Sequence, residues 1–343
     1  KGAGVKPVKD FALLEEMRRF LQWRARDAIL LAEANVLAGE SLDYFGDEGD
    51  RLQMMLNFPV NQRLFYSLAT GDARPLARAI RETGDNVPRD AQWVNFLRSH
   101  DELDLGRLTK AQRGRVLEAF APDPSMRLYQ RGIRRRLAPM LGNDRRRMEL
   151  AFSLLFALPG TPMLQYGDEI GLGEDLSLNE REATRTPMQW TAEPHGGFTK
   201  AKKAVLPVVE EGIFGYRKVN VDAQRRDPDS FMNWLVRLIR TRKECTELAW
   251  GKCEVLESGS PSVLALSYEF RGAAMVTLHN FADAAQTLRL KLALEGGERL
   301  VDLLAEEHSK ADRRGVHELV LDGYGYRWYR VGVVDETLTR KRF

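Results

Sequence analysis

The sequence predicts an α/β protein: a (β/α) barrel region followed by a small antiparallel β domain. Three observations lead to this prediction. Helices with one apolar face alternate with short, mostly apolar runs, which are typical of buried parallel strands. Carboxylates stand at the ends of two of these runs, where a barrel places its active site. After residue 250 the pattern changes to short alternating segments separated by turns.

The barrel region is predicted from apolar spacing and from helix start and stop signals. These signals indicate helices at 11–26, 74–84 and 143–160. Asp144 is the expected N-cap of the third helix. The apolar runs that follow these helices predict strands at 28–32, 91–99 and 161–167. The segment 104–142 is long and polar, and we expect it to form an inserted subdomain.

The stretch "DPDSFMNWLVRLIRTRKEC" predicts a last barrel helix, with Asp227 as its cap and Pro228 in its first turn. Beyond Gly251, segments such as "SVLALSYEF" and "AAMVTLHNF" alternate like antiparallel strands. We therefore expect two domains: a partial (β/α) barrel at 1–250 and a β-sandwich at 251–343.

Composition excludes several classes of protein. The chain has 52 basic and 49 acidic residues, a net charge of +3 that implies no acidic partner. Cys245 and Cys253 lack metal-site spacing and are too few for a disulfide scaffold, so we expect two packed thiols. No apolar run reaches the roughly 18 residues of a membrane span, so we expect no membrane partner.

The stretch "RGIRRRLAPMLGNDRRR" offers a nucleic-acid alternative, because its arginines are clustered. They alternate with apolar residues, however, and no aromatic ladder accompanies them. We expect a solvated helix face here and no nucleic-acid partner.

Two strand ends carry residues suited to acid–base chemistry. Glu33 ends the run "AILLAE", where burial would raise its pKa and let it protonate a leaving oxygen. His100 and Asp101 follow the run "VNFLRS". Carboxylates on either side of a sugar are what glycoside chemistry requires. The alternatives are a salt-bridged Glu33 and a core histidine at His100.

Several motifs resemble those of a known family and occur in its order. They are "ILLAEAN", "FLRSHDELD", "LGNDRR", "GDEIG", "RTPMQW" and "GYRKVNVDAQRRDPDSFMNW". The chain is similar over about 28–234 to the α-amylase superfamily (glycoside hydrolase family 13) and, within it, to the trehalose synthase family of maltose α-D-glucosyltransferases. "LGNDRR" and "RTPMQW", with "GDEIG" upstream, are specific elements of this resemblance.

The resemblance implies roles for four residues. Glu33 matches the general acid/base, and Asp101 matches the aspartate that stabilises the transition state. His100 matches the histidine that hydrogen-bonds the sugar in the scissile subsite. Arg181 matches the arginine that clamps the non-reducing glucose. Arg185 is expected to shape its loop first and to contact ligand second.

The family nucleophile, an aspartate in a "GFRLD"-type motif, has no match in the sequence. The resemblance therefore implies that the chain corresponds to the C-terminal half of a (β/α)8 TIM barrel, from about strand 5 to helix 8. We expect this chain to be inactive alone. No cofactor is expected for the chemistry, and a structural calcium would take its ligands upstream of Lys1. We expect a cytoplasmic protein, and the sequence leaves open whether it forms an oligomer.

The sequence departs from the family around the acceptor sugar. Where the family reads "NHDELTLE", this chain reads "SHDELDLG". Ser99 replaces an asparagine, and Gly106 replaces a glutamate associated with closing the pocket; Asp104 could substitute for it. Glu182 replaces an aspartate near Arg181.

The resemblance thus implies a retaining enzyme for a small α-glucoside such as maltose or trehalose. Trehalose synthase-like isomerisation of maltose to trehalose is the expected activity. The alternatives are an α-glucosidase or α-amylase-type hydrolase, a transglucosidase, and a non-catalytic relative.

Overall fold

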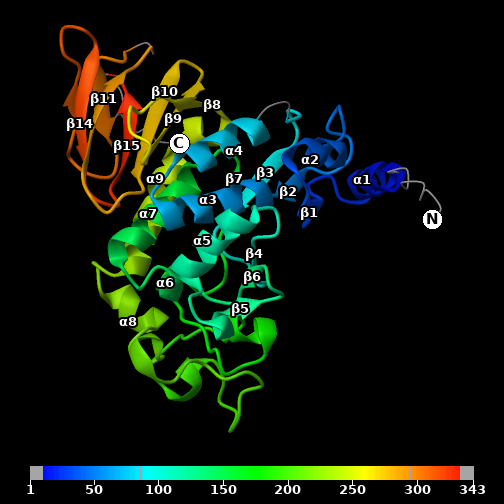
Figure 1. Ribbon diagram of the computed structural model, residues 1–343. Helices are drawn as coiled ribbons and strands as arrows, with labels where there is room; N and C mark the ends of the chain where they lie inside the picture. The colour runs from blue at the N-terminus through cyan, green and yellow to red at the C-terminus, as the bar shows by residue number, and fades with distance from the viewer. Residues whose placement is uncertain (1–10, 85–86, 294–295, 333–343) are drawn as a thin grey trace.

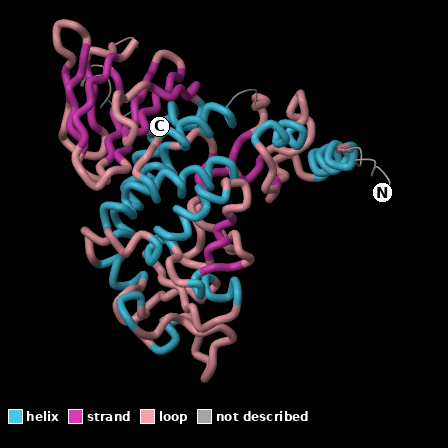
Figure 2. The backbone as a smooth tube through the Cα atoms, viewed as in Figure 1, coloured by secondary structure: helices cyan, strands magenta, loops and turns pink. Residues whose placement is uncertain are grey.

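The computed structural model describes residues 11–84, 87–293 and 296–332. Within these ranges, helices and short parallel strands occupy the first part of the chain, and antiparallel strands occupy the last (Figures 1 and 2). No helix in the described ranges is both long and apolar enough to cross a membrane.

A parallel sheet organises the first part. In the described ranges it has the order β1-β2-β3-β7, and each neighbouring pair is parallel. Its strands follow the same order in space and in sequence: β1 (Leu31–Ala32), β2 (Met54–Leu56), β3 (Gln92–Phe96) and β7 (Thr161–Met163). The carboxyl ends of all these strands therefore meet at one edge, as they do in a barrel.

Helices lie before, between and after these strands in the chain. They are α1 (Ala12–Arg24), α2 (Ala38–Phe45), α3 (Phe58–Thr70), α4 (Arg74–Gly84), α7 (Arg145–Ala157), α8 (Val221–Arg226), α9 (Phe231–Glu244) and α10 (Thr246–Trp250). The predicted cap of α7 is confirmed, because Asp144 accepts hydrogen bonds from the N–H groups of Arg146 and Arg147 at 2.8 and 3.4 Å. The buried face of α7 forms part of the main hydrophobic core.

The segment between β3 and α7 forms a small subdomain of its own. It contains β4 (Leu103–Asp104), α5 (Lys110–Phe120), β5 (Arg127–Leu128), β6 (Gly132–Ile133) and α6 (Leu137–Met140). The three strands pair antiparallel in the order β4-β6-β5. In Figure 1 this subdomain and the loops near α8 lie away from the C-terminal sheets.

The predicted C-terminal β region is confirmed. In the described ranges an antiparallel sheet has the order β13-β12-β15-β10-β9-β8, and β11 pairs with β14 in a second sheet. The strands are β8 (Lys252–Leu256), β9 (Val263–Phe270), β10 (Ala273–Asn280), β11 (Gln286–Lys291), β12 (Arg299–Asp302), β13 (Ser309–Lys310), β14 (Val316–Leu321) and β15 (Tyr326–Val331).

The larger sheet is buried on both faces. One face contributes Leu264, Leu266 and Trp328 to the core shared with α3, α7 and α9. The opposite face packs Val276 and Leu278 against apolar residues of β11 and β14. Because successive side chains of a strand point to opposite faces, β9 and β10 are buried along almost their whole length.

Three local predictions were wrong. β1 is an edge strand of two paired residues, with Leu31 exposed, rather than a strand buried on both faces. α9 begins after Ser230, whose Oγ accepts from the Asn233 N–H at 3.2 Å, and not at Asp227. β7 spans only Thr161–Met163 of the predicted 161–167, and its residues are partly exposed rather than buried. In addition, β2 was missed, because its three residues show too short a pattern.

The prediction of a solvated helix face is wrong for two residues of the arginine cluster. Arg135 Nε pairs with Glu174 Oε1 at 2.8 Å, and Arg136 Nη1 pairs with Asp168 Oδ1 at 3.1 Å. Arg136 is buried, and Arg135 is mostly so. These two arginines neutralise acidic groups inside the protein, whereas the side chains of Arg131 and Arg146 are 54% and 67% exposed.

Candidate active site

Three of the four predicted site residues converge at the edge where the parallel strands end. Ligand-type atoms of Glu33, His100 and Asp101 all lie within 4.8 Å of one another. Glu33 follows β1, and the His100-Asp101 pair follows β3 across the intervening strand β2. The side chains come together because parallel strands present their carboxyl ends to one edge.

The expected burial of Glu33 is wrong for this chain. Glu33 and His100 are both exposed, and Asp101 is partly exposed. Glu33 is open because β1 has a strand neighbour, β2, on one side only within the described residues. The core-histidine alternative for His100 is therefore excluded, since this side chain faces solvent at the strand ends.

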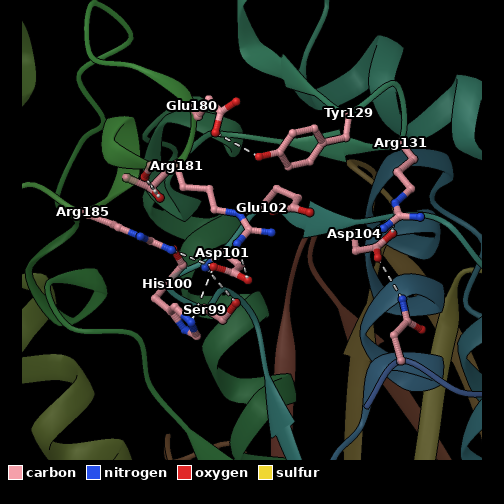
Figure 3. A network of polar contacts seen from close by, with 12 residues as sticks. Ser99, His100, Asp101, Glu102, Asp104, Tyr129, Arg131, Glu180, Arg181 and Arg185 are labelled. Carbon is pink, nitrogen blue, oxygen red and sulfur yellow. Dashed lines mark hydrogen bonds and ion pairs between the residues drawn. The ribbon is translucent and has the colours of Figure 1, made fainter. Parts of the chain in front are cut away.

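Two arginines meet the Asp101 carboxylate, as Figure 3 shows. Arg181 Nη1 lies 3.1 Å from Oδ2, and Arg185 Nη2 lies 2.7 Å from Oδ1. Arg185 Nε also donates to the His100 carbonyl at 2.8 Å. Arg181 and Arg185 therefore both lie against the strand-end cluster, in direct contact with Asp101.

Sequence reasoning missed Glu102 and Tyr129. Glu102 Oε2 accepts a hydrogen bond from Arg181 Nε at 2.7 Å, and its side chain is only 5% exposed. The Tyr129 ring lies 5.7 Å from the Arg181 guanidinium carbon, and its hydroxyl donates to Glu180 at 3.0 Å (Figure 3). Glu102 could have been suspected from its place directly after His-Asp, but Tyr129 lies far along the chain and gave no signal.

A buried ion pair lies next to this cluster. Asp168 is paired with Arg136, and the buried Arg98 side chain is close enough to affect it. Burial raises the pKa of Asp168 to about 6, because desolvation outweighs the attraction of the two guanidinium groups. Burial also lowers the pKa of Arg98 to about 10. Arg98 donates to the Asp101 carbonyl at 3.0 Å, so it connects the buried charges to the site.

A cavity of about 700 Å³ opens beside His100. Its wall is formed by the ends of β3 and β7 and by residues 184–187 and 198–206. Arg185, Tyr166 and Phe198 contribute to this lining. Phe198 is half-exposed, so an aromatic face is available next to the charged cluster. Such a combination suits a sugar, which has both polar and apolar faces.

Two domain families match the sequence. The alpha-amylase catalytic domain matches residues 134–251, and the sucrose hydrolase-like C-terminal domain matches residues 272–330. The first match covers the loops that carry Arg181 and Arg185, and the second covers most of the C-terminal strands.

The most similar proteins include trehalose synthases. The chain is 37% identical over 329 residues to one from Thermus thermophilus, covering 95% of this chain and 34% of that protein. It is 35% identical over 339 residues to one from Pimelobacter sp. (strain R48), covering 95% and 59%. The chain thus spans only about a third to three fifths of the length of these relatives.

Solved structures share the fold. An α-amylase from H. orenii superposes with a TM-score of 0.67 at 17% identity, over 94% of this chain and 57% of that one. The barrel-type sheet, the strand-end cluster and the sequence matches agree with one another. They confirm that this chain resembles the α-amylase superfamily (glycoside hydrolase family 13) and, within it, the trehalose synthases.

Proposed function

We propose that the protein containing this chain is a retaining α-glucoside-processing enzyme that isomerises maltose to trehalose by intramolecular glucosyl transfer. The observation that carries the proposal is the convergence of Glu33, His100 and Asp101 within 4.8 Å at the strand ends. The 35–37% identity to trehalose synthases supports the choice of sugar.

In this proposal the four site residues have distinct tasks. Glu33 protonates the departing glycosidic oxygen and later acts as the base that activates the incoming hydroxyl. Asp101 and His100 hold the sugar ring as positive charge develops on it. Arg181 binds the glucose on the non-reducing side, and its contacts with Asp101 and Glu102 support a fixed orientation.

A sugar is a better occupant of this cluster than a metal ion. Glu33, His100 and Asp101 have atoms close enough together to ligate a cation. Both oxygens of Asp101 are, however, already paired with guanidinium groups of Arg181 and Arg185. These positive charges oppose a cation at the same carboxylate, whereas neutral sugar hydroxyls can share such hydrogen bonds.

We further propose that residues 1–250 form part of a (β/α)8 barrel, with an insertion at 104–142, and that residues 251–343 form a β-sandwich domain. The attacking carboxylate of the retaining mechanism is assigned to a segment outside residues 1–343. The greater length of the relatives supports this assignment. The chain alone is accordingly proposed to be inactive, and the whole protein to act in the cytoplasm.

The test uses the protein encoded by the complete gene. Maltose is supplied as substrate, trehalose and glucose are quantified over time by chromatography, and Glu33→Gln serves as the inactive control. Trehalose in excess of glucose, abolished by Glu33→Gln, is the expected result. Glucose alone would establish a hydrolase and overturn the isomerase proposal. Neither product, with the variant indistinguishable from wild type, would overturn the assignment of Glu33.

A further inference from the structure

The segment after Glu33 is fixed by side chains rather than by the sheet. β1 pairs with β2 through Leu31 and Ala32 only. No hydrogen bond joins the Glu33 carboxylate to another residue in the described ranges. The position of Glu33 therefore depends on what holds the backbone immediately after it.

Asn35 fixes this part of the backbone through hydrogen bonds to three residues. Its Nδ2 donates to Asp104 Oδ2 at 3.0 Å, its Oδ1 accepts from Gln62 Nε2 at 3.3 Å, and its carbonyl accepts from Arg107 Nη2 at 2.6 Å. Gln62 Oε1 in turn accepts from the Arg107 backbone N–H at 2.9 Å. The contacts form a closed ring that joins the segment after β1 to α3 and to the turn after β4.

Asp104 links this ring to the other half of the site. It belongs to β4, three residues after Asp101, and its side chain is 15% exposed. Its Oδ1 accepts from the Gly106 N–H at 2.7 Å and lies 3.6 Å from Arg131 Nε. One carboxylate thus connects the backbone after Glu33 with the backbone after Asp101.

Gly106 is required for this conformation of Asp104. A Cβ atom at position 106 would lie 2.9 Å from Asp104 Oδ1, closer than such atoms normally approach. A side chain at 106 and Asp104 in its present position therefore exclude each other. A side chain at 106 would therefore shift the end of the Asp104 side chain.

We propose that Asp104 is a positioning residue for Glu33 and acts through Asn35. The inference rests on the proposed function, in which Glu33 is the general acid. A proton donor must be held within hydrogen-bond reach of the leaving oxygen, and a displacement of about 1 Å can lower a rate by about 100-fold. Losing Asp104 should release Asn35 and impair proton donation without removing the groups that bind the sugar.

Two substrates separate proton donation from binding. Maltose has a poor leaving group and needs a general acid, whereas p-nitrophenyl α-glucoside has an activated leaving group that needs little protonation. We expect Asp104→Ala and Asn35→Ala each to lower kcat/KM for maltose roughly 10- to 100-fold. The value for p-nitrophenyl α-glucoside should change much less. The double variant should be no worse than the more impaired single variant, because the two substitutions break the same Asn35–Asp104 contact.

Matched variants serve as controls. Gly106→Ala should reproduce part of the maltose defect, since the added methyl group displaces Asp104. Asp123→Ala removes an exposed aspartate of the same subdomain, whose carboxylate accepts from the Ser125 N–H at 2.8 Å. This variant should leave kcat/KM for both substrates unchanged. The inference would be overturned if Asp104→Ala lowered kcat/KM equally for both substrates, or lowered it for neither.

Failure of the proposed function can be told apart from failure of this inference. Wild-type protein that processes neither substrate would refute the function and leave the positioning contact to be tested directly. Amide hydrogen exchange of residues 30–40 is then compared between wild type, Asp104→Ala and Asp123→Ala. Faster exchange in Asp104→Ala alone would support the inference that the Asn35–Asp104 contact fixes this segment. Unchanged exchange would overturn that inference.

Discussion

Glu102 holds Arg181 in place: Arg181 Nε donates to Glu102 Oε2 at 2.7 Å, and the accepting side chain is almost fully buried. Arg181 also reaches Asp101, so one buried carboxylate orients the arginine that meets the site aspartate. The pair is charge-assisted, and such hydrogen bonds are about twice as strong as neutral ones.

Glu102→Gln keeps the size of the side chain but removes its charge. We expect the apparent KM for maltose to rise roughly tenfold, since a charge-assisted hydrogen bond contributes about 1.5–3 kcal/mol. Steady-state kinetics of the complete protein measure the effect. Glu118→Gln, which alters an exposed position on α5, is the control and should leave KM unchanged. Equal kinetics for the two variants would show that Glu102 does not orient Arg181.

Asp168→Asn tests the buried charges under the site. Arg136 and Asp168 are 1% and 3% exposed and lie 3.1 Å apart. Removing one partner of a buried pair leaves an uncompensated charge, which typically costs about 3–5 kcal/mol. At pH 8 Asp168 is ionised in the wild type. We therefore expect urea unfolding at this pH to show that the variant's free energy of unfolding is lower by this amount. A loss below about 1 kcal/mol would show that water or Glu174 already neutralises Arg136.

The sequence was most informative where structure is decided locally. α7 has a capping aspartate, a long apolar face and a proline stop, and all of these act within a few residues of each other. β3 is five residues long and buried, so its apolar run was sufficient to find it. The positions of Glu33, His100 and Asp101 followed from the rule that parallel strands end at one edge.

The remaining features depend on partners distant in sequence. Glu33 is exposed because of which strands flank β1, and its own apolar neighbours do not encode that arrangement. The pairing of Asn35 with Asp104 spans 69 positions, and that of Arg181 with Glu102 spans 79. Side chains that meet over such separations are set by tertiary packing, which periodicity does not report.

His279 should make the stability depend on pH. It is completely buried, with Nε2 3.0 Å from Ser153 Oγ, which accepts from Trp328 Nε1. Burial lowers the pKa of His279 from 6.5 to about 3, because the charged form would be desolvated. The unfolded chain therefore binds more protons than the folded one between these values. The stabilising contribution is complete above pH 6.5 and is lost as the pH falls toward 3.

The measurement is the free energy of unfolding of wild type and His279→Gln between pH 8 and pH 4. Wild type should lose up to about 1.4 kcal/mol more per pH unit than the variant below pH 6.5. The difference between the two proteins isolates this group from Asp168, whose raised pKa gives the opposite slope at acid pH. Parallel curves for the two proteins would show that His279 does not titrate on unfolding.

Cys245 and Cys253 should be unreactive in the folded protein. Both are free thiols, as predicted from the sequence. Burial raises the pKa of Cys245 to about 12 and that of Cys253 to about 11, and the thiolate is the reactive form. At pH 8 we therefore expect iodoacetamide to label neither residue in native protein and both in urea, as measured by mass spectrometry. Rapid native labelling of Cys253 alone would indicate that β8, the edge strand that carries it, opens from the sheet, because β8 pairs only with β9 among the described strands.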